Sequence, residues 1–277
     1  MPGEPIQSRR ETDALPGAPP LPAPPVAECH EACPDACSHR AEVFLFDSSV
    51  EIDIAIHAPA PLEADLARAI EARWQRLLPS NPRLFAGPIL SITSFDASGR
   101  IRCARETYKA LAVQPEVATG AELLAVIGLI TMRDAANRTH LLLGQRGPQV
   151  RIYPGLWEVA PAGGINPPPP GVDRLGIVGV LAQLEEELEE EIGARWALKN
   201  PRAVAAVRNP HAHSLDIVIR AEVEPPGTIP ASAGSEWEYA QVSWMPMADV
   251  WRACDERPET LVPQTLAVLR AMRERLL

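Results

Sequence analysis

Alternation of hydrophobic and polar residues predicts strands in several parts of the chain. It is strict over Glu51–His57, where Ile52, Ile54 and Ile56 fall on one face and the polar residues on the other. Short apolar runs bounded by turn residues predict the remaining strands. These are Val43–Phe46, a hairpin of Ile89–Phe95 with Arg100–Arg105, Ala121–Thr131, Thr139–Gln145, Ala203–Val207, Leu215–Val223 and Tyr239–Met245.

Apolar residues three and four positions apart predict helices at Pro61–Leu78, Asp173–Ile192, Met247–Cys254 and Thr260–Leu277. The first carries the apolar stripe Leu62, Leu66, Ala69, Ile70, Trp74 and Leu77, with charges opposite, and the last should bury Leu261, Thr265, Val268, Leu269 and Met272. Strands on both sides of a central helix, with a helix at the end of the chain, predict an α/β (α+β) fold. Its mixed central sheet should be covered on two faces.

The chain divides into a tail and two ordered regions. Residues 1–28 are rich in Pro, Ala and Glu, and we expect the tail of residues 1–40 to be disordered. Residues 41–115 predict a small N-terminal α+β subdomain, and residues 116–277 the main domain. With 277 residues, the chain can bury a sizeable core.

The tail carries a cluster of soft metal ligands. Cys29, Cys33 and Cys37 lie close to His30 and His39, and such a set could hold zinc as thiolates and imidazoles. A second half-site at ordinary zinc-finger spacing is missing from the sequence. A mobile segment with free thiols is therefore the favoured interpretation, and a zinc tether to a partner protein is a further one.

Net charge and cysteine content narrow the classes of function. The formal charge of −10 argues against binding nucleic acid or acidic membranes through the whole surface. It allows an anionic ligand whose phosphates are bridged by metal. The apolar runs are too short for a membrane span, and the N-terminus lacks the pattern of a secretory signal. The odd number of cysteines, five, does not suggest a disulfide framework, so we expect a cytoplasmic protein.

The most unusual stretch is Leu184–Gly193, in which six of ten residues are glutamates. On a helix, Glu187, Glu190 and Glu191 share one face, next to the apolar stripe. Like charges repel there, and the nearby helix C-terminus also disfavours anions. A solvated acidic face is one interpretation. A bound Mg²⁺, held by carboxylates and substrate phosphates, would turn the repulsion into attraction.

The order of motifs around this helix resembles the Nudix hydrolase family. Pro154–Glu158 and Pro161–Gly164 precede the helix, and Glu187, Leu188, Glu190, Glu191 and Gly193 match the second half of the family's box position for position. The resemblance implies a Nudix-like α/β/α sandwich with a small N-terminal α+β extension. It also implies Mg²⁺ or Mn²⁺ bound by the matching glutamates Glu187, Glu190 and Glu191, and hydrolysis of a diphosphate bond.

The first half of the box departs from the family pattern. Glu186 stands where the family has arginine, Val178 where it has its first glutamate, and the prolines 167–170 read as an insertion. Short motifs at Ala69–Trp74, Asn81–Pro88 and Thr107–Lys109 resemble the N-terminal region of UDP-glucose/UDP-galactose diphosphatases, which also carry an irregular box. This resemblance favours a UDP-sugar-like substrate, a nucleoside diphosphate linked to another small molecule.

Roles for other residues follow from the same resemblance. A backbone carbonyl at Ala162 or Gly163 would complete the metal shell, and the small residues Gly163 and Gly164 would let phosphate approach closely. Arg146 and Arg151 could clamp phosphate oxygens. Glu238 or Glu236 could act as general base, and for all four charged residues a solvated surface position is the alternative.

Three aromatic or imidazole side chains have simpler interpretations. Trp157 is expected in the core, and His211 and His213 in an exposed turn, although the histidines could face a sugar or phosphate.

Many relatives dimerise, so a homodimer is possible. A second functional hypothesis is a Nudix-fold module that binds a nucleotide-linked ligand without cleaving it, which the degraded first half of the box would favour.

Overall fold

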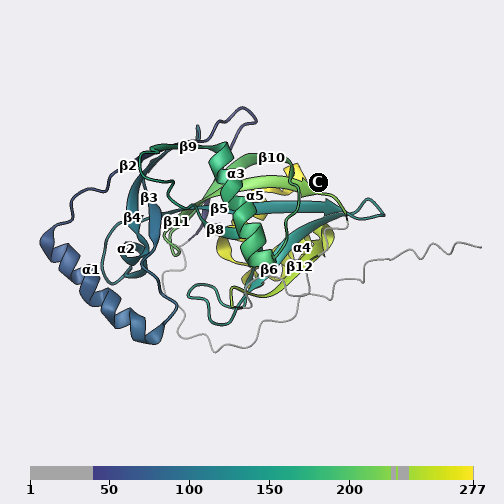
Figure 1. Ribbon diagram of the computed structural model, residues 1–277. Helices are drawn as coiled ribbons and strands as arrows, with labels where there is room; N and C mark the ends of the chain where they lie inside the picture. The colour runs from purple at the N-terminus through teal and green to yellow at the C-terminus, as the bar shows by residue number, and fades with distance from the viewer. Residues whose placement is uncertain (1–39, 226–228, 230–236, 277) are drawn as a thin grey trace, which may run out of the picture.

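The computed structural model describes residues 40–225, 229 and 237–276 (Figure 1). These residues form a twelve-stranded mixed sheet with the main order β1-β10-β11-β5-β3-β4-β2-β9, to which β6, β7, β8 and β12 add through β5 and β6. The strands are β1 Glu42–Leu45, β2 Asp53–His57, β3 Pro88–Phe95, β4 Arg100–Thr107, β5 Leu123–Arg133, β6 Thr139–Arg146, β7 Trp157–Val159, β8 Ala162–Gly164, β9 Arg174–Gly176, β10 Lys199–Asn209, β11 Ser214–Val223 and β12 Tyr239–Pro246.

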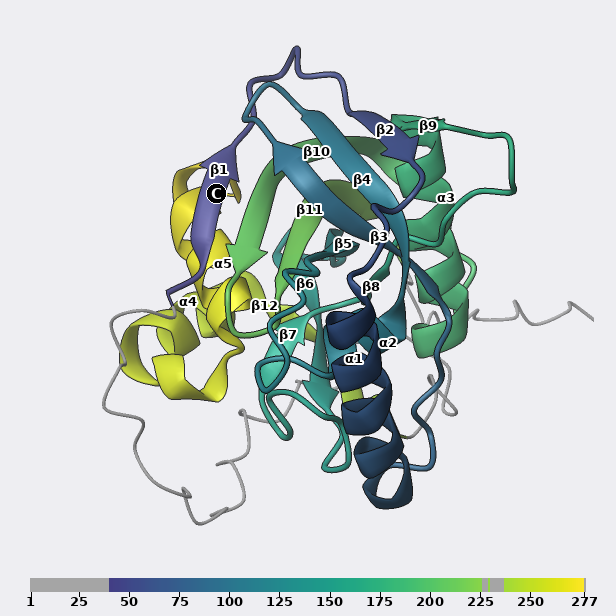
Figure 2. The same ribbon diagram turned by 90° about the vertical axis from the view of Figure 1, so that its left-hand side faces the viewer.

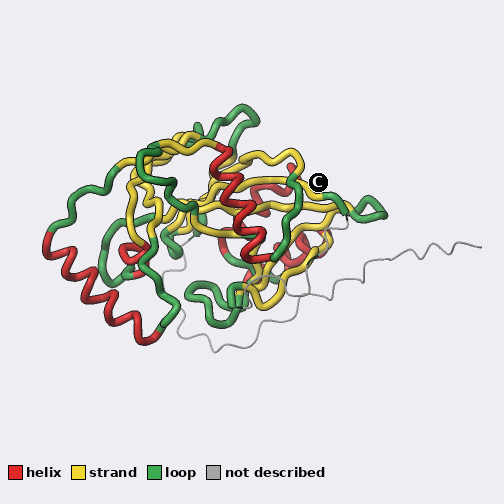
Figure 3. Tube along the Cα trace, viewed as in Figure 1, coloured by secondary structure: helices red, strands yellow, loops and turns green. Residues whose placement is uncertain are grey.

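Helices lie on both sides of this sheet, as the pattern of hydrophobic residues predicts. Figure 2 shows α3 on one side of the strands and α4 and α5 on the other, and Figure 3 distinguishes the helices, in red, from the strands, in yellow. The helical segments are α1 Ala64–Leu77, η1 Leu78–Ser80, α2 Tyr108–Ala112, α3 Ile177–Glu187, η2 Leu188–Ile192, α4 Met247–Glu256, η3 Pro258–Thr260 and α5 Pro263–Leu276. Within the described ranges, no helix is long and apolar enough to cross a membrane.

The two faces of the sheet carry two separate cores. Successive side chains of a strand point to opposite faces. On β5, Leu124 and Val126 accordingly pack in the core beneath α3, while Ile127 and Leu129 pack in the core beneath α4 and α5. All five residues predicted for the buried stripe of the last helix are buried, although Leu261 lies before α5, which begins at Pro263. The strand β5 is therefore central to both layers.

Strands from the predicted N-terminal subdomain extend the sheet of the main domain. β1 pairs with β10, β3 pairs with β5, and β2 pairs with β9. On α1, Ile70 and Trp74 pack against Ala112 and Val113. Of the apolar stripe predicted for this helix, Leu62 precedes α1 and is half exposed. The division at residues 115 and 116 stays a prediction.

The central helix begins later than the sequence pattern predicts. Helix was expected from Asp173, but Arg174–Gly176 form the short strand β9, antiparallel to β2. The pairing is reinforced by a hydrogen bond from Ile56 N to Asp173 O of 2.7 Å and by the ion pair of Arg174 with Asp53. The predicted end at Gly193 is confirmed. Its φ of 71° is the left-handed conformation in which glycine commonly stops a helix.

Candidate functional site

The acidic helix widens where its glutamates are concentrated. After Glu187 the α-helix continues as a π-helical turn, η2, and Ala194 N then donates to Leu188 O at 3.2 Å. Such turns are rare and frequently lie at functional sites. Leu188 and Ile192 keep their places in the core, and Glu191 is buried beside them with 5% exposure. A carboxylate is therefore held inside the protein at the end of this helix.

Glu187 and Glu191 pack against the backbone of β8. Ala162 N donates to Glu191 Oε2 at 3.0 Å. The carboxylate of Glu187 lies against Gly163, where an added Cβ would meet its carbon and oxygens at 2.1–2.4 Å. Any larger residue at Gly163 would displace that carboxylate. The sequence motif Pro161–Gly164 and the acidic helix are thus brought into direct contact, as the resemblance implies.

A buried glutamine also positions Glu187. Gln183 Nε2 donates to Glu187 Oε1 at 2.9 Å and to Glu186 Oε2 at 3.1 Å. Its Oε1 accepts from Asn166 N at 3.0 Å, so the same side chain ties the loop after β8 to the helix. Sequence reasoning did not single out Gln183. The sequence signal for Gln183 was its spacing: it lies four residues before Glu187 and directly precedes the buried Leu184.

Both carboxylates are disfavoured in their charged form. The pKa of Glu187 is raised to about 7, mainly by burial and also by the charges of Glu190 and Glu238, against the hydrogen bond from Gln183. Burial also raises the pKa of Glu191 well above its ordinary value, with the charges of Glu238 and Glu187 adding to the effect. The strongest charge effects on each thus come from other carboxylates, which a bound cation would relieve.

The donor set fits a divalent cation that is shared with a ligand. Within the described residues, no three His, Cys, Asp or Glu side chains converge closely enough to hold a metal ion by themselves. Mg²⁺ is usually bound through one or two carboxylates plus substrate phosphates, rather than in an all-protein cage. Glu187 and Glu191, with the close backbone of β8, match that requirement.

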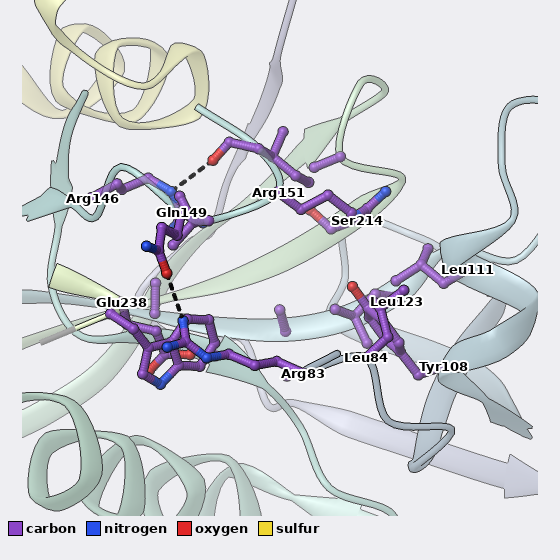
Figure 4. A pocket seen from close by; sticks show the side chains of 18 of the residues that line it. Arg83, Leu84, Tyr108, Leu111, Leu123, Arg146, Gln149, Arg151, Ser214 and Glu238 are labelled. Atoms are coloured by element: carbon purple, nitrogen blue, oxygen red, sulfur yellow. Dashed lines mark hydrogen bonds between the residues drawn. The ribbon is translucent and has the colours of Figure 1, made fainter. Parts of the chain in front are cut away.

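A cavity of about 730 Å³ opens next to these glutamates (Figure 4). Glu191, Glu238 and the β8 residues Ala162–Gly164 line one part of it. The N-terminal region supplies another part, from residues 80–85 and from α2. In Figure 4, Leu84, Tyr108, Leu111 and Leu123 gather on the side away from Glu238. Its volume lies within the range of about 300–1,000 Å³ that is usual for small-molecule sites.

The predicted phosphate ligands Arg146 and Arg151 both line this cavity. Arg146 is also committed to protein partners: it forms an ion pair with Glu158 and donates through Nε to Ile152 O at 2.9 Å. Arg151 is exposed, and its charge adds to burial in lowering the pKa of His213. Arg151 is therefore more accessible to a ligand than Arg146.

Glu158 is a cavity residue that sequence reasoning missed. It lies on β7 with 2% exposure, and burial raises its pKa although the charge of Arg146 lowers it. The motif Pro154–Glu158 gave no local signal for this, because the burial of Glu158 depends on the pairing of β7 with β6 and on the ion pair with Arg146. The other residue of that motif, Trp157, lies in the core as predicted.

The remaining candidates differ in their placement. Glu238 lines the cavity, whereas Glu190 is exposed, is absent from the lining, and acts on Glu187 only through its charge. His211 packs against the Tyr153 ring at 5.4 Å, and of the described residues around this turn Ala212, not His211 or His213, lines the cavity. The candidates outside the described residues are Glu236, Cys29, Cys33, Cys37, His30 and His39.

Comparison with known proteins gives similar solved structures only. No protein-family model and no curated protein matches the chain. The MutT protein from Methanosarcina mazei Go1 is 19% identical over 56% of this chain and 94% of its own, with a TM-score of 0.39. The NUDIX domain of Shewanella oneidensis NrtR, complexed with ADP ribose, is 20% identical over 57% and 90%, with a TM-score of 0.38. A NUDIX hydrolase from Alicyclobacillus acidocaldarius is 14% identical over 55% and 90%, with a TM-score of 0.39.

Two of these three structures carry the Nudix name, the family that the sequence motifs resemble.

Proposed function

We propose that this protein is a metal-dependent hydrolase of the Nudix type. Its reaction would cleave the diphosphate bond of a nucleoside diphosphate that is linked to another moiety, with UDP-sugars favoured. One observation carries the proposal: Glu187 and Glu191 are held, desolvated, against the backbone of Gly163 and Ala162. Glu191 and both of these backbone residues line the large cavity.

Glu187 and Glu191 would hold Mg²⁺ or Mn²⁺ together with phosphate oxygens of the substrate, and Glu190 would contribute from the exposed side. A bound Mg²⁺ would neutralise the diphosphate and lower the pKa of an attacking water. Gln183 would fix the orientation of Glu187 through its 2.9 Å hydrogen bond. The missing Cβ at Gly163 leaves the space in which that carboxylate lies, and it keeps the backbone open to phosphate.

The other charged residues of the cavity would handle the proton and the phosphates. Glu238 lines the cavity, and its charge raises the pKa of both Glu187 and Glu191, so it lies close to the same point. In this position it can accept a proton from the attacking water, as a general base must. Arg151 would bind phosphate directly, while Arg146, paired with Glu158, would mainly support the wall of the cavity.

The cavity supports a substrate with groups on both sides of the diphosphate. Its walls come from residues 80–85 and α2 and from the loop at 146–152, and Arg83 Nη1 of the first segment donates to Gln149 Oε1 of the loop at 3.3 Å. A nucleoside triphosphate alone would use only part of this lining. The resemblance of residues 69–88 to UDP-sugar diphosphatases points in the same direction.

The test is hydrolysis by the purified full chain with Mg²⁺ and a panel of UDP-sugars, ADP-ribose, dinucleotides and nucleoside triphosphates. We expect release of a nucleoside monophosphate, and a loss of about 100- to 1,000-fold in kcat/KM for Glu191→Gln, because removing a metal ligand costs several kcal/mol of transition-state stabilisation.

Glu189→Gln is the matched control for this test. Glu189 lies in the same turn but is exposed and paired with Arg195, so this variant should keep full activity. Equal activity of both variants would overturn the metal assignment.

A second candidate is a Nudix-fold module that binds its ligand without turnover. The box position that the family gives to a glutamate is occupied by Val178, whose side chain is 78% exposed and contributes little to the core. Tight binding of a sugar nucleotide, with no monophosphate released at any Mg²⁺ or Mn²⁺ concentration, would select this alternative.

A further inference from the structure

We propose that Asp216 and Ser214, on β11, form a subsite that binds the hydroxyl groups of a sugar in the ligand. This inference rests on the proposed function for its ligand, a sugar nucleotide, and names residues that neither the sequence motifs nor the metal site include. Both side chains line the cavity, at a distance from the glutamate cluster.

The register of the sheet places this pair on the cavity floor. Asp216 pairs with Ala125 of β5, and Ala125 pairs with Gly164 of β8, so the three lie in one row across the sheet. Ser214 pairs with Leu123 in the same way. Residues in one row point to the same face, and strands lie about 4.8 Å apart, so Asp216 is roughly 10 Å from Gly164. Ala125 and Gly164 are small and leave the floor between the two ends open.

Asp216 is buried and lacks the partners that a buried carboxyl needs. Its side chain is 3% exposed and that of Ser214 is 4% exposed. Ser214 Oγ donates to Asp216 Oδ2 at 3.3 Å, while Oδ1 accepts no hydrogen bond from any residue that the structure describes. Burial raises the pKa of this carboxyl to about 7, with the charges of Glu158 and Glu122 adding to the effect. Leaving such a group unsatisfied costs stability, so a binding role would explain its presence.

The surroundings favour hydroxyl groups over phosphate. The charges that act on Asp216, those of Glu158 and Glu122, are both negative, and Arg146 and Arg208 are paired with these two carboxylates. A phosphate would be repelled here. Of two adjacent hydroxyl groups, one can donate to Oδ1 of Asp216 and the other to Oγ of Ser214, whose own hydrogen is donated to Asp216, so a sugar diol satisfies both side chains.

The position along the floor favours a sugar over a nucleobase. A sugar is bonded directly to the diphosphate, whereas a base is separated from it by the ribose. Asp216 lies two strand spacings from the β8 backbone, a distance that matches a sugar bonded to a diphosphate lying against β8. The sugar can be the ribose of the nucleoside or the sugar on the other side of the diphosphate, and the test below separates the two.

The experiment measures Kd by isothermal titration calorimetry for the full chain with Mg²⁺, and each probe carries a methylene group in place of its bridging diphosphate oxygen so that it cannot be hydrolysed. The probes are UDP-glucose, which has a sugar on both sides of the diphosphate, and CDP-choline, which has only the nucleoside ribose. We expect Asp216→Asn to weaken UDP-glucose binding about tenfold, and Ser214→Ala to weaken it less, as loss of a hydrogen bond to a buried group predicts. Thr131→Val, a buried polar change on β5 outside the cavity lining, is the matched control and should bind like the wild type.

Each outcome decides the proposal. Weakening for UDP-glucose alone supports a subsite for the linked sugar, and equal weakening for both probes supports a subsite for the ribose. Unchanged binding of UDP-glucose in Asp216→Asn, or a wild-type chain that binds neither probe, overturns the subsite. Hydrolysis is measured separately with Mg²⁺. If the wild type hydrolyses sugar nucleotides but Asp216→Asn leaves binding unchanged, the subsite alone is refuted. If Asp216→Asn weakens binding but the wild type hydrolyses none of them, only the proposed reaction is refuted.

Discussion

The two helices that cover opposite faces of the sheet differ in the charges at their C-terminal ends. The last turn of α5 contains Arg273 and Arg275, cations that the negative end of a helix stabilises. The end of α3 and η2 contains no basic residue and instead carries Glu187 and Glu191, partly or fully buried. Both helices contact the same sheet, so packing against strands does not explain the contrast.

The contrast separates a helix selected for stability from one that carries a site. α5 buries Val268, Leu269 and Met272 and points its charges outwards. α3 buries Leu184 and Leu188 in the same manner, but it also holds two carboxylates in an environment that raises their pKa. Proteins accept such a cost mainly where charge is needed for binding or chemistry.

Met272→Ala on α5 should produce the largest loss of stability and leave the chemistry intact. Met272 is 1% exposed, and removing a buried side chain of this size costs roughly 2–5 kcal/mol. Urea unfolding should show the loss, while kcat/KM per folded molecule should equal that of the wild type. A large change in kcat/KM would mean that α5 is not merely structural.

Glu187→Gln on α3 should change stability in the opposite direction, and only at higher pH. The folded-state pKa of Glu187 is raised to about 7, so ionising it in the folded protein costs free energy. Wild-type stability should therefore fall as pH rises from about 4.5 to 7 and stay reduced above that, with a contribution of at most about 3 kcal/mol. The Glu187→Gln variant should lack the part of this stability loss that comes from ionising Glu187. Urea unfolding of both proteins at pH 5 and pH 8, without divalent metal, measures the difference. Parallel curves for the two proteins would contradict this account.

Gly163→Ala should damage activity more than stability. The new methyl group would meet the carboxylate of Glu187, which can move because it is the end of a flexible side chain. A displacement of about 1 Å at a reacting centre can cost on the order of 100-fold in rate. The same change at Gly171, where an added Cβ meets nothing within 4 Å, is a control for activity, although its φ of 91° adds backbone strain. Full activity of Gly163→Ala would show that the position of Glu187 is unimportant.

Arg273→Ala should have the smallest effect. The pair of Arg273 with Asp255 has N–O distances of 2.9 Å, but both side chains are substantially exposed, and exposed pairs contribute little to stability. Thermal unfolding should therefore shift far less than for Met272→Ala. A comparable shift would mean that the charges of α5 matter more than its apolar stripe.

The sequence pattern predicts most of the fold because the strong signals are local. Alternation in Glu51–His57 and the glycine at 193 correspond to a strand and a helix end in the structure. The strand Arg174–Gly176 could not be predicted in this way, since its three residues are extended only because β2, more than a hundred residues earlier, supplies a pairing edge.

The candidate site is predictable to a similar degree. The contact of Glu187 and Glu191 with Ala162 and Gly163 follows from the order of motifs that the sequence shares with a known family. Glu158 and Asp216 enter the cavity only through sheet register, which joins distant strands and leaves no local pattern. Their carboxylates look like ordinary polar residues until the strands are placed side by side.

The most direct test of the central claim is the melting temperature as a function of Mg²⁺ concentration at pH 8, with NaCl of equal ionic strength as reference. If Glu187 and Glu191 hold a cation, Mg²⁺ should raise the melting temperature of the wild type by mass action. It should have little effect on a Glu187→Gln, Glu191→Gln double variant, which should itself melt higher than the metal-free wild type. Equal responses of the two proteins to Mg²⁺ would contradict the claim.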